Sequence, residues 1–182
     1  MRCSPRLLLP ALLLSSSVTA HAEQLVGDYW IVHHQGDLGV NELFVADGDA
    51  AHIVDRPGGI QSLGVYQVYE KTGKKLTSYD VEIDCGKNRV RINDAQDFGV
   101  FNDWTPVKVS SKWQSQPDAW LARSRDFLCQ PGERASMRHL GKMSPLAMID
   151  ESREVFSALG REQYKAAILK TIDDAFDRMA QQ

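Results

Sequence analysis

The sequence predicts an α+β protein: an antiparallel β-sheet meander with a short helix before the second of two cysteines and C-terminal helices packed on the sheet. Between Leu25 and Val109 the chain consists of short runs rich in β-branched and aromatic residues, separated by Gly, Asn, Asp and Pro. Such runs are typical of strands and turns. After Ser144 the apolar residues recur every three or four positions instead, as they do in amphipathic helices.

The first 22 residues have the pattern of a cleaved signal peptide. Two arginines precede a short apolar run at residues 7–14, and residues 20–22 read Ala-His-Ala, with small residues at the positions that signal peptidase recognises. The apolar run reaches only about 12 Å as a helix, too short to cross a bilayer. Because Cys3 precedes this run, it is not placed as a lipid-attachment cysteine. We expect a periplasmic or secreted protein that is neither a lipoprotein nor inserted in a membrane after cleavage.

The chain after the leader has the length of a single domain. Removing 22 of 182 residues leaves 160, which we divide into a β-rich domain at 23–143 and a C-terminal helical extension at 144–182 packed on the same domain. The leader takes two arginines with it, so 19 basic residues face 24 acidic ones and the formal charge is −5. A net negative charge without a basic tail argues against a nucleic-acid partner.

Three strands are expected near the start of this domain. Tyr29 to His33, Glu42 to Ala46 and Ala51 to Asp55 are short runs with strand composition, and residues 56–59, which read Arg-Pro-Gly-Gly, predict a turn after the third.

A hairpin is the clearest pattern in the chain. Val65 to Lys71 and Lys75 to Cys85 flank the short connection 72–74, and the basic strand Arg89 to Asn93 should pair back on the second arm. Along the second arm, two sets of side chains alternate: Tyr79, Val81, Ile83 and Cys85 against Ser78, Asp80, Glu82 and Asp84. The first set should enter the core, and the second should face water or pair with Lys87, Arg89 and Arg91.

Later segments predict one more strand and three helices. Trp104 to Val109 is a further strand candidate, and Pro117 to Cys129 predicts a helix with Ser115 as its cap. A helix should start at Pro145 and stop at Gly160. In the last helix the apolar residues form a stripe: Tyr164, Ala167, Ile168, Ile172, Ala175, Phe176 and Met179. The stripe must meet a sheet or a partner, and we expect core packing rather than membrane binding, because its polar side is acidic.

Cys85 and Cys129 predict one disulfide. They are the two cysteines left after the leader, and an even number in an oxidising compartment favours pairing. Closing a loop of this length stabilises the fold by about 4 kcal/mol in the chain-entropy model.

The sequence offers little for catalysis. His33 and His34, with His52 and Asp37, invite a metal hypothesis, but neighbouring strand residues point to opposite faces and zinc-binding spacings are lacking. No nucleophile elbow, phosphate-binding loop or dinucleotide fingerprint is present. We therefore expect no metal or other cofactor and no catalytic residue.

Aromatic and basic residues suggest a binding surface instead. Trp and Tyr are favoured interface anchors, so Tyr66, Tyr69 or Trp113 beside Arg89 and Arg91 would form a patch suited to another protein.

One family resembles this arrangement. The run Tyr79 to Cys85, the return strand Arg89 to Ile92, the segment Trp104 to Val107 and the closing Phe127 to Cys129 resemble the surface-adhesin protein E family of exported bacterial proteins. The resemblance spans roughly residues 30–129. It implies one antiparallel sheet with a helix against it, a strand-to-helix disulfide, and binding to host matrix or plasma proteins through a basic strand, here Lys87, Arg89 and Arg91.

Three functional hypotheses follow. The first is an exported, non-catalytic module that binds a host or envelope protein. The second is an inhibitor of an exported hydrolase, with Gln35 to Asn41 as its inserted loop. The third is a small periplasmic enzyme that uses His33, His52 or the carboxylate face.

Overall fold

The computed structural model describes residues 26–71, 74–99, 101 and 103–180. The predicted leader and the connecting residues 72–73 lie outside this part of the chain.

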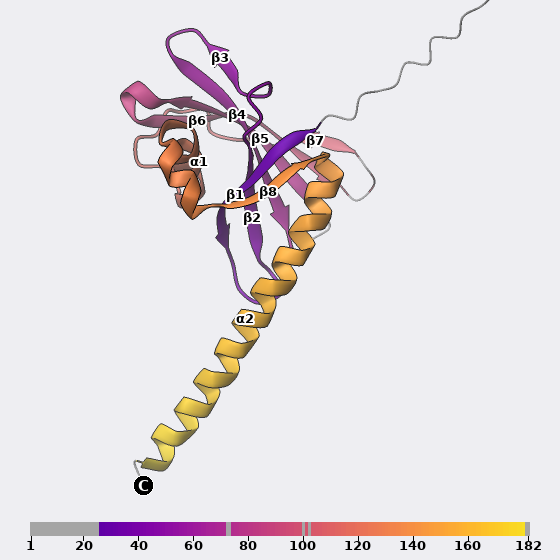
Figure 1. The fold of residues 1–182 in the computed structure, drawn as a ribbon, viewed down its shortest axis with the longest axis vertical. Helices are drawn as coiled ribbons and strands as arrows, with labels where there is room; N and C mark the ends of the chain where they lie inside the picture. The colour runs from indigo at the N-terminus through magenta and orange to yellow at the C-terminus, as the bar shows by residue number, and fades with distance from the viewer. Residues whose placement is uncertain (1–25, 72–73, 100, 102, 181–182) are drawn as a thin grey trace, which may run out of the picture.

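Strands of one open antiparallel sheet form the body (Figure 1). The strands are β1 (Gly27–Gln35), β2 (Glu42–Asp47), β3 (Val54–Arg56), β4 (Ile60–Tyr69), β5 (Lys74–Asp84), β6 (Arg89–Gly99), β7 (Trp104–Pro106) and β8 (Arg138–Met143). Their order across the sheet is β7-β6-β5-β4-β2-β1-β8, and β3 pairs with β4 beside this path. The meander from β4 to β7 and the α+β class therefore agree with the prediction from sequence.

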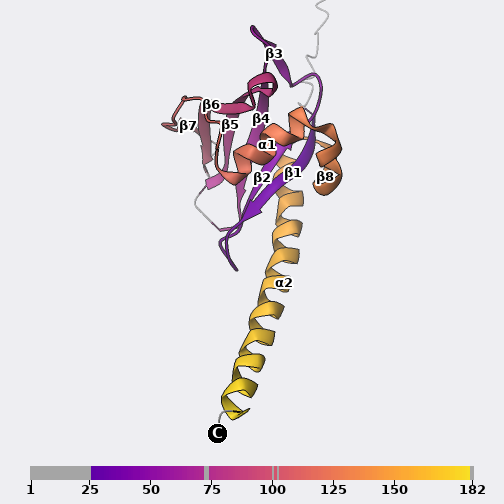
Figure 2. The ribbon, with the colours of Figure 1, turned by 90° about the vertical axis from the view of Figure 1, so that its left-hand side faces the viewer.

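A helix lies against each face of this sheet. These are α1 (Ala119–Cys129) and α2 (Pro145–Ala180), while the short 3₁₀ helices η1 (Cys85–Lys87) and η2 (Pro131–Ser136) complete the connections. Figure 2 shows α1 and the start of α2 on opposite sides of the strands. The fold thus has three layers, with the sheet in the middle.

Two apolar clusters hold the layers together. Leu121 and Phe127 of α1 bury their side chains against one face, among Phe44, Leu63, Val65, Val81 and Ile83. Met148, Ile149, Val155 and Phe156 of α2 pack on the other face, among Tyr29, Leu43, Val45 and Val68. Because strand side chains alternate between faces, adjacent residues of β2 supply both clusters.

A disulfide joins Cys85, directly after β5, to Cys129, the last residue of α1. It attaches α1 to the end of the sheet where β5 turns into β6. The pairing itself agrees with the prediction from the cysteine count.

Several expected element boundaries were wrong. The third strand covers Val54–Arg56 rather than Ala51 to Asp55, because residues 51–52 form a turn in which the Asp49 carbonyl accepts bonds from the amides of His52 and Ile53. The helix before Cys129 has Asp118, not Ser115, at its N-cap position, and the Asp118 side chain makes no capping hydrogen bond.

The C-terminal region is one helix, not two. α2 continues through Gly160 for 36 residues, and the expected stop there was wrong. Glycine inside a helix costs only about 1 kcal/mol, and the flanking Ala, Leu, Arg and Glu favour helix. Figures 1 and 2 both show the later half of α2 extending beyond the sheet. The predicted core packing of the stripe from Tyr164 to Met179 was also wrong, because its large side chains are exposed.

Candidate binding surface

The predicted basic strand forms a cluster with Trp113 on the sheet face that carries α2. Arg91 binds the Glu82 carboxylate at 2.6 Å, and Arg89 binds Asp84 at 3.0 Å. The Trp113 ring lies over both guanidinium groups, 4.5 and 4.6 Å from its centroid. Trp113 reaches this position because the next residue, Gln114, makes two backbone hydrogen bonds with Val90 at the edge of β6.

Of the three acids on this face of β5, Asp80 is partly exposed, whereas Glu82 and Asp84 pair with the basic strand instead of facing water. Glu82 and Asp84 are only 6% and 4% exposed, because the arginines and Trp113 cover them. Carboxylates are buried at acceptable cost when they are paired and hydrogen-bonded. The predicted pairing between the acidic and basic strands is therefore present, and it is what allows these acids to be buried.

Asp84 also shows an electrostatic consequence of this cluster. Burial acts to raise the pKa of Asp84, but the Arg89 hydrogen bond, the Lys87 backbone N–H and the charges of both residues outweigh it, so the pKa lies below its ordinary value. Lys87 itself is exposed, with Nζ 3.8 Å from Asp84.

Tyr66 and Tyr69 do not join the arginine cluster. Tyr66 of β4 lies opposite Ser78 of β5. Arg91 of β6 lies on the other side of β5, opposite Glu82, which is four residues farther along that strand. The Tyr66 ring instead meets Tyr29 edge to face, and burial raises the pKa of Tyr66. The Tyr69 hydroxyl is 2.7 Å from Thr77 on the opposite face of the sheet. Of the three predicted aromatic residues, only Trp113 lies beside the arginines.

An apolar cleft, which sequence reasoning did not find, opens on the same face. It has a volume of about 340 Å³ and lies between β4, β5, β6, β7 and the first turns of α2. Its walls are formed by Tyr66, Leu76, Ser78, Phe98, Trp104, Pro145, Leu146 and Ile149. Trp104 and Leu146 at its rim are 51% and 61% exposed. The cleft is therefore accessible to an apolar side chain from outside.

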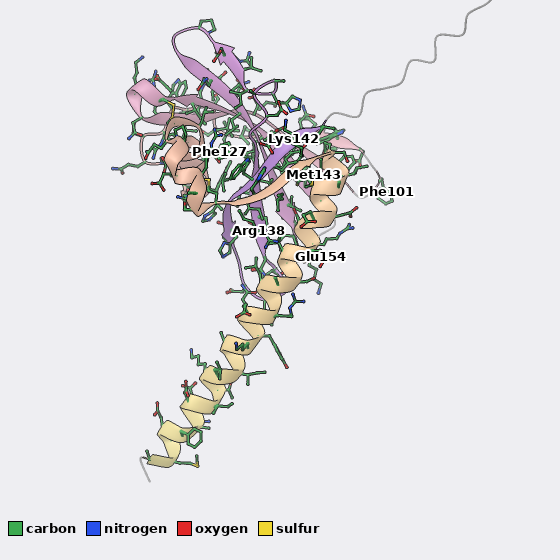
Figure 3. All side chains as sticks on the ribbon, viewed as in Figure 1. Phe101, Phe127, Arg138, Lys142, Met143 and Glu154 are labelled. Atoms are coloured by element: carbon green, nitrogen blue, oxygen red, sulfur yellow. A yellow bond between two sulfur atoms is a disulfide. The ribbon has the colours of Figure 1, made fainter. Side chains whose placement is uncertain are left out.

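The elements around this cleft explain its shape. β7 pairs Trp104 with Phe98, and the two rings pack with their centroids 4.8 Å apart. One residue separates the end of β8 from Pro145, where α2 begins, and the first turns of the helix give Pro145, Leu146 and Ile149 to the walls of the cleft. Phe101 projects from the same end of the body (Figure 3), with 89% of its surface exposed.

A polar depression adjoins the cleft. It has a volume of about 310 Å³ and shares Ser78 and Trp104 with the cleft, while Asp80, Asp94 and Gln96 supply its polar groups. Asp80 is held by Asn93 at 2.8 Å, by the Ser62 hydroxyl and by Arg56 at 3.7 Å. Asp94 is exposed and accepts one bond from Gln96. The apolar walls of the cleft therefore lie next to the carboxylate groups of the depression.

The histidines proposed for a metal or an enzyme lie apart. The register of β1 shifts between Ile31 and His33, yet the His33 and His34 rings remain 6.5 Å apart. Burial, aided by the charges of His34 and Arg123, lowers the pKa of His33. His52 bonds Asp47 at 2.7 Å elsewhere. Within residues 26–71, 74–99, 101 and 103–180, no three His, Cys, Asp or Glu side chains are arranged to hold a metal ion.

The loop proposed for hydrolase inhibition is tied to α2. Asn41, at its end, is buried and exchanges amide hydrogen bonds of 3.0 and 2.9 Å with Gln163. Leu38 and Val40 in the same loop are exposed. The described helices include no segment both long and apolar enough to cross a membrane.

Comparison with protein-family models, curated proteins and solved structures finds no match to this chain. The residues and their geometry therefore carry the functional conclusion.

Proposed function

We propose that this chain is an exported, non-catalytic protein-binding module, similar in kind to surface-adhesin protein E, and that its ligand site is the cleft at Trp104 and Leu146. The partner is a host or envelope protein. The cleft, rather than the basic strand, is the proposed contact, since Arg89 and Arg91 are already engaged by buried carboxylates.

The observation that carries this proposal is an exposed Trp at the rim of an apolar cleft. Soluble proteins rarely expose contiguous apolar surface without a use, and Trp and Tyr anchor a large share of interface energy. Trp104, Leu146 and Phe101 all lie at this end of the body, and the Tyr66 ring forms a wall of the cleft.

The polar depression defines the chemistry of the partner. Asp94 is an exposed carboxylate on β6, the strand that also gives Phe98 to the cleft, and the chain as a whole is acidic. A partner segment with an apolar side chain followed by a Lys or Arg would fill both hollows. Complementary charge of this kind adds specificity and raises the association rate.

Capture from cell-envelope and host plasma fractions tests the proposal. The bait is the chain from Glu23, the start that export predicts, compared with Trp104→Ala/Leu146→Ser. Proteins captured by the wild type should be lost from the variant, and a purified partner should bind the variant at least about tenfold more weakly.

Val40→Ser is the matched control, because Val40 is equally exposed but lies in the β1–β2 loop, away from the cleft. Its capture should equal that of the wild type. Equal capture by wild type and cleft variant would exclude the cleft as the site.

A further inference from the structure

The later half of α2 carries a large apolar surface that its own body does not cover. Among the described residues of this half, six large apolar side chains are exposed: Tyr164, Ile168, Leu169, Ile172, Phe176 and Met179. Residues 161–180 extend about 30 Å at 1.5 Å per residue. A helix that exposes an apolar surface of this length to water is expected to bind a partner that covers it.

The apolar face changes side along the helix. In the first half the buried positions are Met148, Ile149, Ser152, Val155 and Phe156. At 3.6 residues per turn, these positions and the stripe centred on Ile168 and Ile172 lie on roughly opposite sides of the helix axis. The stripe therefore faces away from the side by which α2 binds the sheet.

Gln163 fixes the direction in which this arm leaves the body. Its side-chain amide exchanges hydrogen bonds with buried Asn41, and Glu70 also binds the Asn41 amide at 2.8 Å. Because Gln163 is on the body side of the helix, these bonds hold the stripe outward.

Charge along the arm is arranged in two blocks. Its first half carries Arg161, Lys165 and Lys170, and its second half carries Asp173, Asp174 and Asp177. The exceptions are Glu162 and Arg178, at opposite ends of the arm. Arg161 and Lys165 lie on the apolar side at 3.6 residues per turn, so a parallel pair would place each of them beside the same cation of the other copy, which is unfavourable.

We propose that residues 161–180 pair with the same residues of a second copy, as an antiparallel helix pair about a two-fold axis near Lys170. In this register Ile168 meets Ile172 of the other copy, and Tyr164 meets Phe176. Lys165 lies on the apolar side, and its long stem lets the ammonium reach Asp173, which flanks the apolar side of the other copy. The two bodies then lie at opposite ends of the pair.

The area of this interface suits a reversible dimer. Burying an Ile or Leu side chain removes on the order of 60–120 Å² of apolar surface. Twelve large side chains from two copies give a total on the order of 1,000 Å², close to the lower limit for a specific interface. The antiparallel arrangement is isologous, which is the common form of homodimers. This inference does not depend on the proposed function of the cleft.

Sedimentation equilibrium over a range of concentrations tests the pairing with the whole mature chain. The wild type should be a dimer at high concentration, and Ile168→Asp/Ile172→Asp should be a monomer. Because both side chains are exposed in the single chain, near-UV circular dichroism of the body should not change. Ala166→Asp/Ala167→Asp adds the same charge and should remain a dimer, because at 3.6 residues per turn both positions, including the Ala167 first assigned to the stripe, lie away from its large side chains.

Charge reversal tests the orientation. Lys165→Glu should weaken the antiparallel dimer about tenfold or more, because it faces Asp173 of the other copy. Adding Asp173→Lys to the same chain should restore it. In a parallel pair Lys165→Glu would instead have little effect or strengthen association.

A monomeric wild type at several hundred micromolar, or a dimer that persists in Ile168→Asp/Ile172→Asp, would overturn the proposal. So would wild-type binding to phosphatidylglycerol vesicles that is lost with Ile168→Asp/Ile172→Asp, since it would assign the stripe to a membrane surface.

Discussion

At the scale of single residues, the acids of β5 decide how the edge of the sheet is built. Glu82 and Asp84 alternate with core residues as a solvent-facing set would, yet both are buried beneath Arg89, Arg91 and Trp113. The sequence identified the opposite charges on the two strands. It did not show that Trp113 covers these acids, because Trp113 lies in a segment with no helix or strand periodicity.

Asp84→Asn should lower the thermal stability at neutral pH, since it removes the charge that Arg89 and the Lys87 N–H bind. The native pKa of Asp84 is depressed, so its ionised form stabilises the fold above its ordinary pKa, and this stabilisation is lost as pH falls through the native value. The difference between wild type and variant in unfolding free energy should therefore shrink below about pH 4. Urea melts across pH 2.5–7 measure it.

Asp37→Asn is the control, because this exposed aspartate lies in the β1–β2 loop. A variant of Asp84 as stable as that of Asp37 at pH 7 would show that the ion pair adds nothing to the fold.

At the scale of secondary-structure elements, the patterned segments were predictable and the unpatterned ones were not. The alternation in β5 and the basic return strand from Arg89 placed the central hairpins correctly. β8 was missed because residues 138–143 contain only Leu140 and Met143 as large apolar residues. This strand exists because its backbone pairs with β1, from Gly27 opposite Met143 to Ile31 opposite Arg138.

Substitution of Gly160 tests whether α2 is continuous through this position. Gly160→Ala should stabilise the protein by about 0.5–1 kcal/mol, since Ala has the higher helix propensity and loses less backbone entropy. The added Cβ would lie 3.6 Å from Leu38 Cδ1, an ordinary contact. Thermal melts at low protein concentration provide the measurement.

Gly141→Ala should have the opposite sign. Gly141 has φ +100° in β8, a conformation that L side chains rarely adopt, although there is open space around it. Stabilisation at both positions would show that the effect at Gly160 does not arise from the helix.

At the scale of the whole molecule, a compact body carries a helical arm. Among the described residues of α2, Phe156 is the last buried side chain, Leu159 packs partly buried against the same cluster, and Gln163 makes the last hydrogen bonds to the body. A chain ending at Lys165 should therefore keep the thermal midpoint of the full-length monomer to within about 2 °C.

Ending the chain at Gly160 instead should lower the stability by about 1 kcal/mol, because buried Asn41 loses the Gln163 amide. Differential scanning calorimetry of both truncations checks this. A collapse of the body in the chain ending at Lys165 would contradict the division into body and arm.

The sequence by itself determined the α+β class, the central meander, the cysteine pair and the existence of an amphipathic stripe after Tyr164. These follow from local periodicity and from residue count, which a single chain displays directly. Only the tertiary structure decided that α2 runs straight through Gly160, that the stripe faces away from the sheet, and that Trp104, Tyr66 and Leu146 meet at one cleft. Contacts between residues far apart in the chain depend on how layers pack in space, and periodicity along the chain carries no record of that packing.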